Sequence, residues 1–268
     1  MGIIANFVII FFIMLIDTHA HIYLEQFDND RLDVISRAIN ADIKLMLLPA
    51  INKNYHKSLI ECTKAFPKNC LPMIGLHPTS VKENFEEELE FIRNEIRKNI
   101  FYGIGETGLD YYWDKTFVKE QEIALRVQIE LAINHKLPIV LHSRKSLNEL
   151  LNILHDYRNT ELCGVFHCFP GNVAEAEKVI ELGFYLGIGG VVTYKNASMA
   201  EVVKSISLNH IVLETDAPYL TPVPYRGKRN ESAYIKIIAE KIAKIKEISF
   251  DKVAETTTLN AIKIFNLY

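Results

Sequence analysis

The chain has 268 residues and a formal net charge of −3 at pH 7. A chain of this length buries a full hydrophobic core, as one large α/β domain or as two smaller ones. The charge balance excludes a general attraction to nucleic acid, so such binding would depend on local basic patches. The four cysteines include no CxxC pair, which disfavours a cysteine metal cluster and predicts a reduced cytoplasmic protein with unlinked thiols.

The beginning of the chain is strongly apolar. Residues 2–16 carry no charge, and residues 7–16 are wholly apolar. This run is shorter than the roughly 20 apolar residues of a membrane span. A signal peptide is disfavoured because no basic segment and no small-residue cleavage site precede Asp17. We expect Met14 to be the real start, or residues 1–13 to be a dispensable apolar extension, with one domain at 14–268 and no stable membrane association.

Apolar runs typical of buried strands alternate with amphipathic patterns along the rest of the chain. The predicted strands are residues 14–17, 44–49, 72–76, 102–106, 138–142, 164–167, 185–189 and 211–214. The predicted helices are residues 31–40, 54–66, 86–98, 119–135, 147–157, 173–182, 197–207, 232–245 and 250–265. Continuously apolar strands between helices predict a parallel sheet covered on both sides. Eight such units predict a single (β/α)8 TIM barrel. An open doubly wound sheet is the alternative, disfavoured because no GxGxxG motif follows the first strand.

Polar side chains stand at the C-terminal ends of six predicted strands, where such a barrel carries its chemistry. His19 and His21 lie on the same face of the first strand, because strand side chains alternate with a period of two. The ends of the other five strands carry His77, Glu106, His142, His167 and Asp216. Taken singly, a histidine or aspartate at a strand end most often caps or hydrogen-bonds a loop. Together, buried and unpaired, they would cost several kcal/mol in desolvation, so we predict a metal centre that satisfies them jointly.

The mixture of side chains narrows the metal chemistry. Imidazole with carboxylate suits Zn²⁺, Mn²⁺ or a site that exchanges for Mg²⁺. Four histidines, a glutamate and an aspartate exceed the three protein ligands that usually hold one catalytic zinc ion. They suffice for two divalent ions with a bridging carboxylate such as Glu106. Two ions of this kind activate water to hydroxide for hydrolysis of a phosphodiester or a similar bond.

Six segments of the chain resemble the TatD-type metal-dependent deoxyribonucleases, a branch of the amidohydrolase-like TIM barrels. They are residues 16–21, 75–78, 103–112, 141–144, 167–171 and 214–222, the last of which continues into 225–231. The segments follow the order of the family from Leu15 to near the C-terminus. One departure is Tyr23, because the family commonly has a short acidic or amide residue nearby.

The resemblance implies a role for each candidate ligand. His19 and His21 would bind one metal ion, Glu106 would bridge the pair, and His142 and His167 would hold the second ion. Asp216 would bind metal and orient or deprotonate the attacking water.

The resemblance also implies cleavage of DNA phosphodiester bonds by metal-activated hydroxide, as a 3′→5′ exonuclease on single strands. The alternative is an ester or amide hydrolase on the same scaffold, for example an aminoacyl-tRNA deacylase. The ligand set does not separate the two, because a hydroxide between two metal ions attacks carbonyl or phosphorus alike. A non-catalytic nucleic-acid-binding protein is a further alternative, disfavoured because no ligand is missing. We expect a cytoplasmic monomer.

Two residues near the predicted ligands are candidates for contact with the substrate. His77 is predicted to face a phosphate, and the alternative is a structural histidine held by Pro78. Arg144 follows a predicted ligand by two residues, so its guanidinium is placed to hold a phosphate through two hydrogen bonds. The alternative for Arg144 is a surface salt bridge.

Two loops add further candidates. Arg226 and Arg229 belong to the densest basic cluster of the chain, in a loop after the eighth strand. Contact with backbone phosphates is the prediction for this cluster, and plain solvation is the alternative. Tyr111, Tyr112 and Trp113 follow Glu106 closely, and either stack on unpaired bases or pack their own loop.

Overall fold

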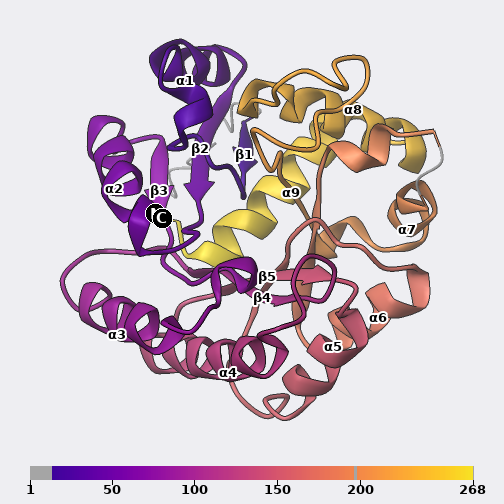
Figure 1. Cartoon of the computed structure of the whole chain (residues 1–268). Coiled ribbons are helices and arrows are strands. Elements are labelled where there is room, and N and C mark those ends of the chain that lie inside the picture. The colour runs from indigo at the N-terminus through magenta and orange to yellow at the C-terminus, as the bar shows by residue number, and fades with distance from the viewer. Residues whose placement is uncertain (1–13, 196–197, 268) are drawn as a thin grey trace, which may run out of the picture.

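Parallel strands alternate with helices throughout the described residues, 14–195 and 198–267, of the computed structural model (Figure 1). The predicted extension at residues 1–13 lies outside them. The strands are β1 (Leu15–Asp17), β2 (Ile43–Leu48), β3 (Cys70–Pro72), β4 (Ile104–Asp110), β5 (Ile139–Arg144), β6 (Gly164–Phe166), β7 (Phe184–Ile188) and β8 (Ile211–Leu213). Each overlaps a predicted strand, but β3 lies earlier than predicted and shares only Pro72 with the expected strand at 72–76.

The strands close into a barrel. β1 to β3 form one parallel sheet and β4 to β8 another, each in sequential order. A parallel bridge between Ile74 and Ile104 joins the segment after β3 to β4. A second bridge, between Ala20 and Ala217, joins the segments after β1 and β8. The predicted (β/α)8 TIM barrel is therefore confirmed.

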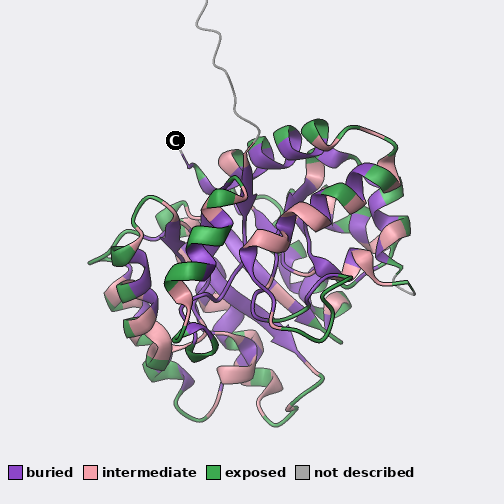
Figure 2. Cartoon of the chain, turned by 90° about the horizontal axis from the view of Figure 1, so that it is seen from above, coloured by how far each residue is buried: buried purple, intermediate pink, exposed green. Residues whose placement is uncertain are grey.

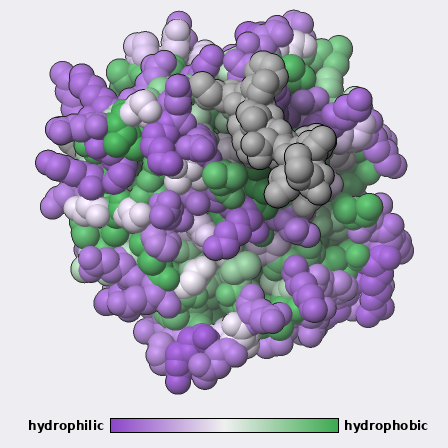
Figure 3. Space-filling view, turned by 180° about the vertical axis from the view of Figure 1, so that it is seen from behind, coloured by the Kyte–Doolittle hydropathy of each residue, from purple (hydrophilic) through white to green (hydrophobic). Residues whose placement is uncertain are grey.

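Helices surround the sheet. They are α1 (Arg31–Asn40), α2 (His56–Ala65), α3 (Phe85–Glu95), α4 (Val118–His135), α5 (Leu147–His155), α6 (Val173–Glu181), α7 (Met199–Ser205), α8 (Ile235–Lys246) and α9 (Phe250–Phe265). Buried residues lie inside and exposed ones on the outer helix faces (Figure 2). On the face seen in Figure 3, hydrophilic side chains dominate, with hydrophobic ones between them. None of the described helices is long and apolar enough to span a membrane.

The interior of the barrel is filled from its N-terminal end by α9. Its side chains Ile264 and Phe265 pack against inward-facing residues of the strands. The Thr258 hydroxyl donates to the carbonyl of Met14 at 2.7 Å, just before β1, and the Asn260 amide donates to the carbonyl of Ile211 at 2.7 Å. Because α9 closes this end, the open end of the barrel is the one at which the strands terminate.

One strand differs from its prediction in a way that matters for the site. The fourth strand was expected to end at Glu106, but β4 continues to Asp110. Gly108 pairs with His142 of β5 and has φ of +138°, and a Cβ there would overlap the His142 carbonyl. Glycine thus permits the close pairing of β4 with β5 that extends the strand. Both Glu106 and Asp110 reach His142 as a result.

Candidate metal centre

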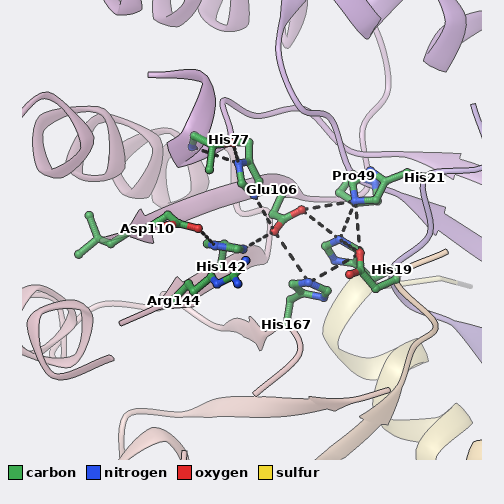
Figure 4. A network of polar contacts seen from close by, with 12 residues as sticks. His19, His21, Pro49, His77, Glu106, Asp110, His142, Arg144 and His167 are labelled. Carbon is green, nitrogen blue, oxygen red and sulfur yellow. Dashed lines mark hydrogen bonds and ion pairs between the residues drawn. The ribbon is translucent and has the colours of Figure 1, made fainter. Parts of the chain in front are cut away.

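Five histidines and two carboxylates meet at the C-terminal end of the barrel (Figure 4). Three groups have ligand atoms close enough to share a metal ion: His19–His21–Glu106, His19–His167–Asp216 and His77–Glu106–His142. The structure therefore brings together all six predicted ligands and also His77, the histidine predicted to face the substrate.

One oxygen of Glu106 faces the two histidines that follow β1. Its Oε2 lies 3.1 Å from Nε2 of His19 and 3.5 Å from Nε2 of His21, and these two nitrogens are 3.2 Å apart. Oδ1 of Asp216 lies 3.8 and 3.6 Å from the same nitrogens. Ligand atoms about 2.1 Å from one ion lie roughly 3.0–3.4 Å apart in octahedral or tetrahedral coordination. The separations of His19 from Glu106 and from His21 fit this spacing, Asp216 stands slightly further out, and the donor types suit a divalent cation.

The other oxygen of Glu106 faces a different set of imidazoles. Its Oε1 lies 2.9 Å from Nδ1 of His142, 3.2 Å from Nε2 of His77 and 3.9 Å from Nε2 of His167. A carboxylate whose two oxygens point to separate groups of nitrogens has the geometry of a bridge between two ions. The ring of His167 also stacks on that of His19, with centroids 3.6 Å apart, so it lies between the groups.

Tyr23 determines which nitrogen of His21 faces the centre. The Tyr23 hydroxyl donates its only hydrogen to the carbonyl of Pro49 at 2.7 Å. Its oxygen is 3.1 Å from Nδ1 of His21, and it must accept the N–H there. Nε2 of His21 then carries the lone pair, which points toward Glu106. The departure from the family pattern at position 23 therefore orients a predicted ligand.

Two further carboxylates lie beside His142 and His167. Oδ2 of Asp110 lies 3.0 Å from Nε2 of His142, and Oε1 of Glu214 lies 3.1 Å from Nδ1 of His167. The carboxylate of Asp110 accepts, so His142 donates outward through Nε2 and turns Nδ1 to the centre. His167 has an ion-pair contact with Glu214, but its Nδ1 makes no hydrogen bond. Such carboxylate–histidine pairs are typical of metal sites, because they hold the ligand in one tautomer.

His77 presents its N–H, rather than a lone pair, to the centre. Its Nδ1 accepts the backbone N–H of Thr79 at 3.1 Å, so the hydrogen of the neutral ring is on Nε2. Burial lowers the pKa of His77, which favours this neutral form. Although His77 is close enough to Glu106 to belong to a metal group, it presents a hydrogen-bond donor to the centre. This agrees with a substrate contact better than with a ligand.

Protons balance the charge of the clustered side chains. Burial opposes ionisation of Glu106, but the neighbouring histidines, His77 first, hold its pKa well below the usual range. Burial also disfavours the charged form of His167, yet the carboxylates Glu214, Glu106 and Asp216 raise its pKa to about 10. The imidazolium supplies positive charge that a bound divalent ion would supply instead, so metal binding should release a proton.

The sequence analysis assigned no role in the site to Asp17 or to three residues beside the histidines, Tyr23, Asp110 and Glu214. The carboxylate of Asp17 accepts hydrogen bonds from the Thr215 hydroxyl at 2.6 Å and from its backbone N–H at 3.0 Å, which ties the end of β1 to the end of β8. Tyr23, Asp110 and Glu214 stand two or four residues from a predicted ligand. That even spacing places side chains on one face of an extended segment, and it could have identified these residues from the sequence.

The predicted basic contacts lie in different surroundings. Arg144 is exposed at the end of β5, and the guanidinium of Arg226 lies 4.4 Å from the ring centre of Tyr194. Arg229 donates to both carboxylate oxygens of Asp30, at 2.8 and 2.6 Å. This ion pair ties the loop after β8 to the N-terminus of α1.

Comparisons with known proteins identify the family of the chain. The family described as TatD related DNase matches residues 16–266. The chain is 38% identical over 255 residues to the uncharacterized metal-dependent hydrolase YabD of Bacillus subtilis, covering 95% of this chain and 100% of that one. It is 29% identical over 248 residues to the 3′-5′ ssDNA/RNA exonuclease TatD of Erwinia tasmaniensis, covering 90% and 96%.

A solved structure gives the same result. The crystal structure of YjjV, a TatD homologue from Escherichia coli K12, matches with a TM-score of 0.89 at 25% identity, covering 95% of this chain and 99% of that one. The chain is therefore a metal-dependent hydrolase built on a TIM barrel. It belongs to the TatD family, as the sequence motifs predicted.

Proposed function

We propose that this chain cleaves DNA phosphodiester bonds, acting as a 3′-5′ exonuclease on single strands. The observation that carries the proposal is the orientation of the Glu106 carboxylate, because its two oxygens face separate groups of imidazoles. A pair of divalent ions is the usual device for in-line displacement at phosphorus. A relative named as a 3′-5′ ssDNA/RNA exonuclease supports nucleic acid as the substrate.

We assign two divalent ions, Mg²⁺, Mn²⁺ or Zn²⁺, to the two sides of Glu106. His19 and His21 would hold one ion through their Nε2 atoms. His142 would hold the other through Nδ1, and His167 through Nε2. When bound, such ions lower the pKa of water and neutralise charge on phosphoryl oxygens.

Asp216 and His77 are proposed to act on the reacting groups. Asp216 is proposed to act as the general base that takes a proton from water. Burial raises the pKa of its carboxyl to about 6 before any ion is bound. Asp216 also has a left-handed backbone, with φ of +56°. The Nε2–H of His77 would donate to a phosphoryl oxygen.

Positive side chains around the mouth are proposed to hold the phosphate backbone. Arg144 stands two residues after His142. Arg226 would contact a phosphate further along the strand, whereas Arg229 is held by its ion pair with Asp30. The four cysteines are free, which is typical of the cytoplasm, where we place the reaction.

The proposal is tested with end-labelled single-stranded DNA beside an aminoacyl ester, each with and without added Mg²⁺ or Mn²⁺. We expect metal-dependent shortening of the DNA from its 3′ end and no turnover of the ester. The Glu106→Gln chain serves as the matched control and should leave the DNA intact. Cleavage of the ester alone would show that the scaffold serves a different substrate class.

A further inference from the structure

An exposed cluster of two aromatic rings and one arginine lies beside the metal centre. Tyr112 and Trp113 follow β4 and are 51% and 67% exposed, and Arg144 ends β5. The guanidinium carbon of Arg144 lies 4.0 Å from the ring centre of Tyr112 and 5.0 Å from that of Trp113. The two rings meet edge to face with centres 5.1 Å apart. Large aromatic side chains gathered at the surface mark binding sites.

Asp110, the residue that orients the predicted metal ligand His142, also holds the backbone of the cluster. Oδ1 of Asp110 accepts the backbone N–H groups of Tyr112 at 2.9 Å and Trp113 at 3.1 Å, while its Oδ2 faces His142 at 3.0 Å. The backbone N–H of Tyr111 donates to the Arg144 carbonyl at 2.9 Å. These bonds fix the position of the rings relative to the centre, which lowers the entropy cost of binding there.

A second contact holds the far side of the same loop. Lys82 forms an ion pair with Asp114 at 2.6 Å, and its ammonium lies 5.2 Å from the ring centre of Phe117. The aromatic residues between Asp110 and Asp114 are therefore tied at both ends, and their exposure does not come from a loose loop.

The chemistry of the cluster matches one kind of ligand. An aromatic ring offers a flat apolar face, and a guanidinium stacked on a ring keeps its N–H edge available for a phosphate. A flat apolar group joined to an anionic group is the chemistry of a nucleotide. Proteins that bind single strands combine stacking rings with positive charge along the backbone in this way.

We propose that Tyr112, Trp113 and Arg144 form a subsite for one unpaired nucleotide next to the scissile bond. Trp113 stacks on the base, and Arg144 binds the phosphate that joins it to its neighbour. The inference rests on the proposed nuclease function and deepens it. A base within a duplex is already stacked on both faces, so this subsite gives the enzyme its preference for single strands.

Fluorescence tests the subsite directly, because Trp113 is the only tryptophan of the chain. The complete chain is titrated with a short single-stranded oligonucleotide whose phosphorothioate linkages resist hydrolysis. A second oligonucleotide has the same backbone but lacks the bases at its 3′ end. We expect the first to quench the emission of Trp113 and the second to bind about ten-fold more weakly, the effect of losing one stacked base.

Kinetics test the same subsite in turnover. Trp113→Ala should raise KM for single-stranded DNA about ten-fold and change kcat little, because stacking is present in both ground and transition states. Its preference for single strands over duplex ends should fall by the same factor, and Trp113→Phe should restore most of both. Arg144→Ala should also raise KM, and Arg126→Ala, at a half-buried arginine of α4 paired with Asp156, is its control.

The possible outcomes separate this inference from the proposed function. Cleavage of DNA without quenching, or equal quenching by the baseless oligonucleotide, would overturn the subsite and leave the nuclease in place. Absence of DNA cleavage with every metal would overturn the nuclease. Base-dependent quenching would in that case still support the nucleotide subsite, and its absence would overturn both.

Discussion

Replacing Asp110 with Asn isolates the effect of one proton in the centre. The Asn side chain keeps an oxygen to accept the N–H groups of Tyr112 and Trp113, so the backbone of the loop should remain in place. Its amide N–H then meets the Nε2–H of His142 across 3.0 Å. To avoid two opposed donors, the imidazole must move its hydrogen to Nδ1, which lies 2.9 Å from Glu106. That nitrogen then has no lone pair for a metal ion.

The magnitude follows from the role of such partners in known metal sites. Loss of the carboxylate behind a metal-bound histidine weakens metal binding by about 10- to 100-fold. This corresponds to roughly 1.4–2.7 kcal/mol of binding free energy. Because His142 lies on the Oε1 side of Glu106, the loss should be confined to one of the two ions, and the site at His19 and His21 should keep its affinity.

Calorimetric titration of the metal-free chain with Mn²⁺ measures both sites. Asp114→Asn is the matched control, because Asp114 lies four residues further along and pairs with Lys82 away from the histidines. A thermal melt of each variant shows whether the fold is retained. If Asp110→Asn binds both ions as tightly as the unaltered chain, Asp110 does not set the tautomer of His142.

Three further predictions concern the same centre. Glu106→Gln removes the carboxylate shared by both groups and should abolish metal-dependent cleavage of end-labelled DNA; a rate near that of the unaltered chain would contradict the bridge. Tyr23→Phe leaves the Nδ1–H of His21 buried without its acceptor, so it should destabilise the fold by about 1–3 kcal/mol in a thermal melt and weaken metal binding at this histidine; an unchanged melt and affinity would refute the assignment. Carboxylates raise the pKa of His167 to about 10 although burial lowers it, so its proton competes with metal up to that pH. Metal affinity should therefore rise with pH, by about ten-fold per unit. Titration in buffers of different ionisation enthalpy should show release of about one proton, and no release would contradict this balance.

The sequence alone determined the fold and predicted the residues that the structure gathers in the candidate centre. Each strand and helix carries its own apolar periodicity, so eight strands were found close to their observed positions. Histidines and carboxylates just after buried strands indicated the open end of the barrel, because parallel strands all terminate on one side. Even the pairing of His19 with His21 follows from local alternation.

Only the tertiary structure decided how the histidines separate into two groups around Glu106 and which ring nitrogens face the centre. The two oxygens of Glu106 separate the histidines into two groups, and this depends on where β1, β5 and β6 stand around β4. The N–H of His21 is directed by a tyrosine whose own hydrogen is taken by Pro49, on another strand's end. Likewise Arg229, read from sequence as a phosphate contact, pairs with Asp30 at 199 residues' distance. Hydrogen bonds act over about 3 Å, whereas periodicity in a sequence reports only neighbours along one element, so such partners emerge when the barrel closes.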